Sequence, residues 1–449
     1  MSAIAKVALE MGHTVTGSDV AVSALLSKLQ ELGAKITIGH HPNNIAGATT
    51  VVYSTAVKED NVELIAARQN SEVTVLHRSD MLAKLLNHAK GIAVAGAHGK
   101  TTTSSMIAYV MKDTGHDPTY VIGGEVVNLG TNAQAGRGDY LVAEADESDG
   151  SFLKYYPSIA VVTNIEADHL ENYDGDFENI KKAYVQFLRQ VKPDGKLVVC
   201  TDDDNVKTLL PKVFADDQIN RQQLITYAIH DKSATYQATD IVEGDRLIKF
   251  NLLSEGQSLG QFVLAVPGLH NVYNAMATII STLEADVELE AIRKSIAKFT
   301  GAKRRFQVIA DSKDLLIVDD YAHHPTEIIA TLRAAKATGK KVKAIFQPQR
   351  FSRTFFLLDE FSKAFPEADE VIITDIYSPA GEVAIEGINS AKLVSLIKEQ
   401  GQQAVRYIPT KEEVIEELKK EITAGDIIIT MGAGDIYKVA YSLAEYINN

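Results

Sequence analysis

The chain has 449 residues, of which 45% are hydrophobic and 23% charged, and it carries a formal net charge of −14. A chain of this length is expected to fold into about two to four domains, each with its own hydrophobic core. No apolar run approaches the roughly 18 residues of a membrane span, no signal peptide opens the chain, and the acidic balance argues against general nucleic-acid binding. We therefore expect a cytoplasmic protein with no membrane or nucleic-acid partner, acting as a monomer or homodimer.

The single cysteine, Cys200, excludes an internal disulfide and a cysteine-based metal site. It ends the apolar run Leu197–Cys200. A cysteine in such a run is expected to be a buried structural thiol.

Short strands alternate with helices over the first 78 residues. The patterns predict helices at 2–11, 23–32 and 61–69, and strands at 13–16, 35–38, 50–53 and 74–76. This alternation is typical of a parallel α/β sheet of Rossmann type. In that fold a strand and a glycine loop precede the first helix, whereas this chain starts at the helix. We therefore expect a first domain, 1–78, that lacks its first strand.

Polar residues follow two of these strands. Asp19 stands where a ribose-binding carboxylate is expected, although it is equally well placed to cap the helix that follows. Ser54 and Thr55 follow the strand 50–53 and form a second candidate ligand loop.

The apolar strand 92–95 breaks into Gly96-Ala97-His98-Gly99-Lys100-Thr101 and resumes as a helix. Such a turn is a phosphate site, because glycines let backbone amides approach an anion and the helix dipole favours negative charge. Lys100 is placed to reach the β- and γ-phosphates, and the Thr101 hydroxyl to bind Mg²⁺. Val94 stands where a full Walker A motif has glycine, so this is a shortened P-loop. A glycine turn with no ligand is the structural alternative.

Two later strands of this second domain, expected at 79–300, also end in polar residues. The strand 140–144 runs into the acidic turn Glu144–Asp149, and the strand 159–163 runs into Asn164–His169. The carboxyl ends of parallel strands meet at one edge of a sheet, so these residues are expected beside the P-loop. Glu144 then becomes a Mg²⁺ ligand or a Walker-B-like acid, and His169 a second metal ligand or a charge-positioning group.

The stretch 197–266 alternates strands with charged turns and is predicted to be a β-rich insertion without chemistry of its own. Asn271 and Asn274 follow on a helix, three residues apart, so their amides face the same side and are placed to contact a base or phosphate. Helix capping is the alternative. Arg304 and Arg305 mark the next boundary, and one of them is a candidate phosphate clamp.

The third domain, expected at 301–449, is a new α/β unit. Its strands, at 315–320, 343–346, 370–374 and 426–430, end in polar or glycine-rich loops. These loops share one edge of the predicted sheet and therefore form a second binding face. Pro325 suits the first turn of a helix at 326–335.

Eight blocks of the chain, in order, resemble those of the Mur ligase family. They are Gly96–Thr103, Glu144–Asp149, Asn164–His169, His270–Asn274, Arg304–Phe306, Asp319–Glu327, Gln347–Arg353 and Met431–Asp435. A single block is moderately specific, whereas eight in register across nearly the whole chain are very specific. The family uses the shortened form of the P-loop.

The resemblance implies three α/β domains: an N-terminal Rossmann-like UDP-binding domain, a central P-loop ATPase domain and a C-terminal Rossmann-like domain that receives an amino acid. The closest resemblance within the family is to members that join L-alanine to the lactyl carboxylate of UDP-N-acetylmuramate. That reaction uses ATP and Mg²⁺, passes through an acyl phosphate, and belongs to cytoplasmic peptidoglycan precursor synthesis.

The resemblance also implies roles for single residues. It assigns catalysis to Lys100, Glu144 and His169, and Mg²⁺ binding to Thr101, Glu144 and His169. It assigns ATP binding to Gly96, Ala97, His98, Gly99, Lys100, Thr101, Thr102, His270, Asn271, Asn274, Arg304 or Arg305, Asp320, Tyr321 and His323. Substrate binding is assigned to Asp19, Ser54, Thr55, His323, Arg350 and Arg353.

The chain departs from the family pattern at its start, where Met1-Ser2 corresponds to the end of the glycine-rich loop. The expected UDP site is therefore incomplete, and an inactive truncation product is one alternative. A murein-peptide recycling ligase of the same family is another. A P-loop NTPase that acts as a partner-binding module is a third, but it leaves the third-domain arginines without a task.

Overall fold

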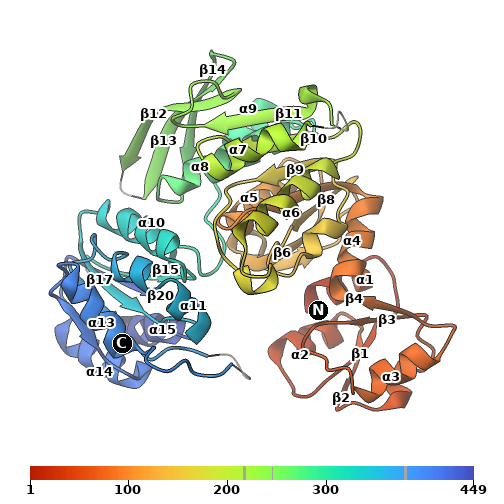
Figure 1. Ribbon diagram of the computed structural model, residues 1–449, viewed down its shortest axis with the longest axis horizontal. Helices are drawn as coiled ribbons and strands as arrows, with labels where there is room; N and C mark the ends of the chain where they lie inside the picture. The colour runs from red at the N-terminus through yellow and green to blue at the C-terminus, as the bar shows by residue number, and fades with distance from the viewer. Residues whose placement is uncertain (216–218, 245, 313, 379–381, 449) are drawn as a thin grey trace. The chain divides into compact units, whose positions relative to one another are not determined.

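The computed structural model describes residues 1–215, 219–244, 246–312, 314–378 and 382–448 (Figure 1). The chain divides into two compact units, which are described separately below. The first contains Met1–Thr239, Leu252–Gly260 and Tyr273–Ala297, and the second Asp240–Asn251, Gln261–Val272 and Lys298–Asn449. The predicted α/β fold class is confirmed, since the larger sheets are mostly parallel and carry helices on their faces.

The first 77 residues form two separate two-stranded parallel sheets, β1-β2 and β3-β4. The elements are α1 (Ser2–Glu10), β1 (Thr16–Asp19), α2 (Ala24–Glu31), β2 (Lys35–Ile38), the 3₁₀ turn η1 (Pro42–Ile45), β3 (Thr50–Tyr53), α3 (Val62–Gln69) and β4 (Thr74–His77). The strand predicted at 13–16 is wrong by three residues. The amides of Gly12 and His13 bond back to carbonyls of α1, so this segment closes the helix before the strand begins.

A ten-stranded sheet follows, with the order β14-β13-β12-β11-β10-β9-β5-β8-β6-β7. Its strands are β5 (Lys90–Ala95), β6 (Thr119–Val126), β7 (Thr131–Gln134), β8 (Tyr140–Glu144), β9 (Ile159–Val162), β10 (Lys196–Cys200), β11 (Leu224–Ala228), β12 (Tyr236–Gly244), β13 (Leu247–Ser254) and β14 (Gln257–Leu264). The strands from β6 through β8, β5, β9 and β10 to β11 pair in parallel, so their carboxyl ends share one edge.

Helices flank this sheet. They are α4 (Arg78–His88), α5 (Lys100–Asp113), α6 (Phe177–Arg189), α7 (Asp204–Val213), α8 (His270–Leu283) and α9 (Leu289–Ile296), with the 3₁₀ turns η2 (Val127–Leu129), η3 (Ser151–Lys154), η4 (Leu170–Asn172) and η5 (Arg221–Gln223). Side chains of α4, α6 and α7, such as Leu86, Phe187 and Leu209, share one core with the sheet. Helix α5 packs against α9.

The predicted β-rich insertion at 197–266 is corrected in two ways. Strands β11 to β14 extend the ten-stranded sheet, so they are a continuation of it and not an inserted body. Helix α7 lies within the stretch, where its N-terminal amide at Val206 donates 2.8 Å to the capping carboxylate of Asp203. The charged turn 202–205 therefore starts a helix, and Pro211 lies inside that helix without ending it.

The second unit holds a six-stranded sheet with the order β15-β16-β20-β17-β18-β19. Its elements are β15 (Gln307–Ser312), β16 (Leu315–Asp320), α10 (Pro325–Lys336), β17 (Lys341–Phe346), α11 (Phe351–Phe356), α12 (Leu358–Ser362), β18 (Glu370–Ile373), α13 (Ser390–Glu399), β19 (Val405–Tyr407), α14 (Lys411–Glu421), β20 (Asp426–Met431) and α15 (Tyr437–Asn448). The four predicted strands are parallel neighbours, so their loops do share one edge. Strands β15 and β19 were not predicted.

The helices of this unit cover opposite faces of the sheet. Side chains of α10, α12 and α13 form one core, and those of α14 and α15 form another. The helix that follows β20 therefore covers one face of the sheet, while the helices that follow its neighbours β16 and β17 cover the other face. A crevice at the carboxyl ends of the strands is expected where the direction changes in this way.

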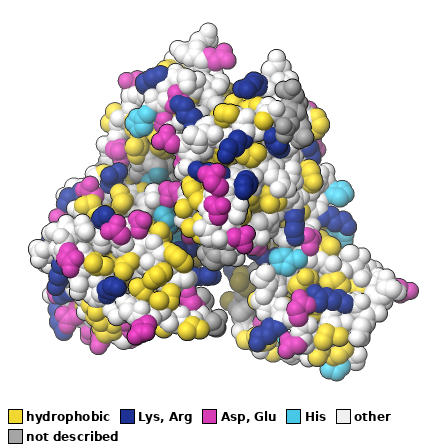
Figure 2. Space-filling model, viewed as in Figure 1, with side chains coloured by type: hydrophobic (Ala, Val, Ile, Leu, Met, Phe, Trp, Pro, Cys, Tyr) yellow, Lys and Arg dark blue, Asp and Glu magenta, His cyan; other side chains and the backbone are white. Residues whose placement is uncertain are grey.

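Within the described residues, no helix has both the length and the apolar character needed to cross a membrane. Figure 2 shows basic and acidic side chains interspersed over the face in view. Cys200 is 4% exposed, as predicted for a buried thiol, and burial raises its pKa to about 12.

Candidate active site

The P-loop adopts a backbone that only glycine accommodates. It connects β5 to α5, with φ of +139° at Gly96 and +85° at Gly99. A Cβ on Gly96 would lie 2.0 Å from Thr163 Oγ1, and one on Gly99 would lie 2.5 Å from Asn274 Oδ1. Both glycines are therefore required by close packing as well as by conformation.

Residues at the end of β9 hold the loop. The amide of Ala97 donates 3.2 Å to the Asn164 carbonyl, and the amide of His98 donates 2.8 Å to Asn164 Oδ1. Thr163 Oγ1 donates 2.6 Å to the His98 carbonyl. Two of the amides expected to face a phosphate are thus bonded within the protein. The amides of the first turn of α5, which has no side-chain cap, remain as the donors for an anion.

Lys100 begins α5 and lies among carboxylates. Its Nζ donates 2.5 Å to the Gly96 carbonyl and 2.8 and 3.0 Å to the two oxygens of Glu147. Burial alone would lower the pKa of Lys100, but the carboxylates of Glu147, Asp146 and Glu144 outweigh it and raise the pKa. The ammonium is therefore charged.

The predicted metal ligands lie on three different elements of the first unit. Thr101 is on the first turn of α5, Glu144 ends β8, and His169 immediately precedes η4 with φ of +56°. The amide of Gly123 donates 2.6 Å to Glu144 Oε1, which orients that carboxylate. His169 Nε2 lies 3.5 Å from Asp168 Oδ2. Carboxylate and hydroxyl oxygens are ligands that suit Mg²⁺.

The two asparagines of α8 have different surroundings. Asn271 Nδ2 donates 2.5 Å to the Pro267 carbonyl, next to His270, which opens the helix. Asn274 is 4% exposed, and its Oδ1 accepts 3.2 Å from Thr103 Oγ1. Asn274 thus ties α8 to α5 behind the P-loop.

In the second unit Arg304 is held by several contacts. Its Nε donates 3.0 Å to Asp319 Oδ2, and its two terminal nitrogens donate 2.6 Å to the Gly432 carbonyl and 3.1 Å to the Gly434 carbonyl. The guanidinium carbon lies 4.9 Å from the centre of the Tyr321 ring. These contacts tie Arg304 to the ends of β16 and β20.

His323 lies in a group of charged side chains. Its Nδ1 is 3.0 Å from the Tyr321 carbonyl, which fixes the proton on that nitrogen, and 3.3 Å from Glu327 Oε2. Burial lowers its pKa to about 4, and Arg353 and Arg305 act in the same direction, while Glu327 opposes them. The imidazole is therefore neutral at pH 7.

Asp320, predicted to bind ATP, anchors the turn after β16. It is 7% exposed and accepts 2.7 Å bonds from the amides of Phe306 and Ala322. Burial raises its pKa to about 6, although Arg305 opposes the shift.

The two predicted arginines after β17 differ in exposure. Arg350 is exposed at the start of α11 with φ of +66°, and its amide donates 2.9 Å to the Tyr377 carbonyl. Arg353 is half-buried and donates 2.8 Å to Gln349 Oε1. Gln349 was not among the predicted residues, although it stands within the Gln347–Arg353 block.

The candidates of the N-terminal domain lie in loops after β1 and β3. Asp19 is exposed, and its Oδ1 accepts 3.4 Å from the amide of Ala21. Ser23, not Asp19, caps α2, so the capping alternative for Asp19 is wrong. Ser54 is half-buried and Thr55 exposed.

Sequence reasoning missed Glu63, the acidic residue in the first turn of α3. Its carboxylate accepts 2.6 Å bonds from Ser18 Oγ and Asn44 Nδ2, and a 3.1 Å bond from the amide of His41. Burial alone would raise the pKa of Glu63, but these hydrogen bonds lower it. Glu63 therefore joins the end of β1 to α3, a role with no signal in spacing or periodicity.

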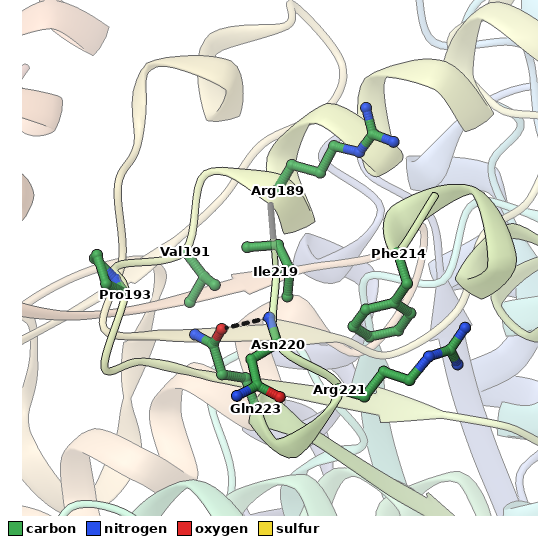
Figure 3. A pocket seen from close by; sticks show the side chains of 8 residues that line it. All are labelled: Arg189, Val191, Pro193, Phe214, Ile219, Asn220, Arg221 and Gln223. Carbon is green, nitrogen blue, oxygen red and sulfur yellow. Dashed lines mark hydrogen bonds between the residues drawn. The ribbon is translucent and has the colours of Figure 1, made fainter. Parts of the chain in front are cut away.

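A cavity of about 600 Å³ lies elsewhere in the first unit (Figure 3). It is lined by Arg189, Val191, Pro193, Phe214, Ile219, Asn220, Arg221 and Gln223. These residues precede β10 or β11, or end the helices α6 and α7, whereas the P-loop is at the carboxyl ends of the strands. None of the predicted site residues lines this cavity.

Three family models together match nearly the whole chain. They are described as the Mur ligase family, catalytic domain, over residues 1–90; the Mur ligase middle domain, over 94–282; and the Mur ligase, glutamate ligase domain, over 304–434.

Individual relatives agree with these models. The UDP-N-acetylmuramate–L-alanine ligase of Symbiobacterium thermophilum is 45% identical over 447 residues, covering 99% of this chain and 92% of the relative. Among solved structures, the UDP-N-acetylmuramate–alanine ligase of Thermotoga maritima matches with a TM-score of 0.81 at 27% identity, covering 100% of this chain and 96% of the other. A murein peptide ligase of Psychrobacter arcticus matches with a TM-score of 0.69 at 25% identity and the same coverage. The chain belongs to the Mur ligase family.

Proposed function

We propose that this chain joins L-alanine to the lactyl carboxylate of UDP-N-acetylmuramate at the expense of ATP, in cytoplasmic peptidoglycan precursor synthesis. The observation that carries the proposal is the P-loop, where Lys100 and the uncapped first turn of α5 face the same edge as Glu144. Similarity to an alanine-adding ligase over 99% of the chain supports the choice of substrates.

The chemistry requires activation, because an oxide ion cannot leave a carboxylate at neutral pH. The carboxylate attacks the γ-phosphorus of ATP, the bond to the β,γ-bridging oxygen breaks, and ADP leaves. The amine of L-alanine then attacks the acyl phosphate carbon, loses a proton, and displaces inorganic phosphate to form the amide. Lys100 neutralises charge on the transferring phosphoryl group, where positioning and electrostatics supply most of the rate.

The donor set of the first unit fits Mg²⁺. The carboxylates of Glu144, Asp146 and Glu147 all act on the Lys100 ammonium, so acidic oxygens are concentrated beside the P-loop. Thr101, Glu144 and His169 would hold the cation, which when bound neutralises phosphate oxygens.

The other predicted residues keep their roles as part of this proposal. Arg350 and Arg353 would bind carboxylate or phosphate groups, and the neutral His323 would donate or accept a hydrogen bond without adding charge. Asp19, Ser54 and Thr55 would contact the UDP-sugar. ATP-binding roles are proposed for four further residues because of the resemblance to the Mur ligase family: His98, Thr102, His270 and Asn271.

The test is phosphate release from ATP and Mg²⁺ in the presence of UDP-N-acetylmuramate, with L-alanine, glycine, L-serine or the recycling tripeptide added in turn. Release that depends on both the sugar nucleotide and L-alanine is the expected result. Dependence on the tripeptide would move the assignment to a recycling ligase, and release without either substrate to a P-loop NTPase.

The matched variant is Lys100→Ala, which should abolish release while circular dichroism shows an intact fold, although its unfolding temperature should fall because Glu147 loses its partner. Normal turnover by that variant would contradict the assignment of the P-loop.

A further inference from the structure

The Lys100 ammonium has three N–H donors, and all of them are used within the protein. Both oxygens of Glu147 accept from it, at 2.8 and 3.0 Å, and the Gly96 carbonyl accepts at 2.5 Å. The two charged side chains are well buried, with 17% of the Lys100 side chain and 5% of the Glu147 side chain exposed. A two-oxygen contact at this burial fixes the position of the lysine head group.

Glu147 is itself held in place independently of Lys100. Its backbone carbonyl accepts 2.5 Å from Tyr173 Oη and 3.1 Å from the amide of Gly150. The neighbouring Asp146 points to a different partner, since its Oδ1 accepts 3.0 Å from the amide of Ser148. The turn after β8 therefore presents one carboxylate, that of Glu147, to the P-loop lysine.

A lysine side chain has four rotatable bonds, and ordering it on ligand binding costs free energy. A carboxylate that orders it beforehand removes part of that cost. The two-oxygen contact also means that the ammonium can turn one N–H toward a phosphate while a Glu147 oxygen still holds another.

We propose that Glu147 is a positioning residue for Lys100, holding its ammonium at the base of the P-loop so that it meets the phosphates of ATP. This inference rests on the proposed ATP-dependent function. Glu147 acts through the lysine and does not itself touch the substrate.

The test measures binding of Mg²⁺-ATP by calorimetry, without sugar nucleotide or amino acid. Glu147→Gln should weaken binding at least about tenfold, because the negative charge and one of the two oxygens that accept from Lys100 are lost. Glu147→Asp, which keeps the charge but shortens the side chain, should bind ATP better than Glu147→Gln. In turnover assays the Glu147→Gln variant should show a raised KM for ATP with little change in the KM for L-alanine.

A double-mutant cycle separates positioning from a general structural role. In a Lys100→Met background, Glu147→Gln should have no further effect on ATP binding, because the residue it positions is gone. Removing both charges also avoids leaving one of them buried and unpaired, which keeps the cycle measurable.

The control is Asp426→Asn, which breaks a more deeply buried ion pair with Lys343 in the second unit, 2.9 Å long. It should lower the unfolding temperature and leave ATP binding unchanged. The proposal is overturned if Glu147→Gln binds ATP as tightly as the parent, or if its effect persists in the Lys100→Met background. A parent protein that binds ATP but does not use L-alanine would instead contradict the proposed function and leave this test intact.

Discussion

Replacing His323 by glutamine should remove a pH-dependent loss of stability from the second unit. His323 is half-buried beside Arg305 and Arg353, and its partial burial, with these charges, lowers its pKa to about 4 from the ordinary value of 6.5. Glu327 opposes the shift without reversing it. In the unfolded chain the imidazole has its ordinary pKa, so it takes up a proton there before it does in the folded protein.

The sign follows from this difference. Above about pH 6.5 the imidazole is neutral in both states and contributes nothing. As the pH falls, the unfolded state binds a proton and the folded state does not, so folding becomes less favourable. With pKa values of 6.5 and about 4, the loss is about 2 kcal/mol at pH 5 and about 3 kcal/mol below pH 4.

The assay is differential scanning calorimetry of the parent and His323→Gln between about pH 7.5 and pH 5. Glutamine changes the hydrogen bond to the Tyr321 carbonyl at every pH, so only the change in the difference counts. A relative gain of about 2 kcal/mol for the variant corresponds to about 4–8 °C in the unfolding midpoint.

Burial raises the pKa of Asp320 to about 6 in the folded protein. The effect of Asp320 on stability is therefore opposite in sign to that of His323: its contribution is present at low pH and is lost as the pH rises through 6. It is present in both proteins and cancels in the difference.

A difference in midpoint that stays constant from pH 7.5 to pH 5 would refute the reasoning. Titration of the His323 ring protons by NMR gives an independent value for its pKa.

Three further substitutions test the packing of the two units. Gly99→Ala should cost roughly 1–2 kcal/mol in denaturant titrations because of its positive φ, and more if Asn274, whose Oδ1 would lie 2.5 Å from the new Cβ, cannot move. Arg304→Lys should lower the thermal midpoint, since a lysine cannot reproduce the fork of contacts made by the guanidinium; an unchanged midpoint would argue against its bracing role. Lys343→Met should cost about 3 kcal/mol by leaving the buried Asp426 unpaired, and adding Asp426→Asn should recover part of that loss in calorimetry.

Much of the fold could be predicted because buried parallel strands are short apolar runs with polar ends. The strands 50–53, 140–144 and 315–320 were predicted with the bounds that the structure has. In each case the loop after the strand lies at the carboxyl edge of its sheet. The candidate site residues could therefore be assigned to one edge from the sequence alone.

Other features could not be predicted because hydrogen bonds between distant residues decide them. Thr163 and Asn164 hold the P-loop by bonds that span about 65 positions of the chain, and no periodicity reports them. Likewise, nothing in the alternating pattern of 197–266 distinguishes an inserted sheet from the edge of an existing one. That distinction depends on pairing such as β10 with β11.

The structure also bears on a choice that the sequence left open, between Arg304 and Arg305 as the phosphate contact. Arg304 already donates to Asp319 and to the carbonyls of Gly432 and Gly434, so binding a phosphate would require breaking contacts that brace the ends of β16 and β20. Arg305 lies 3.6 Å from Glu327, a longer ion pair at a side chain that is 27% exposed. Its guanidinium carbon also lies 5.3 Å from the centre of the Tyr321 ring. Arg304 is therefore committed to bracing the ends of β16 and β20, and the assignment of one of the two arginines to a phosphate stays a prediction.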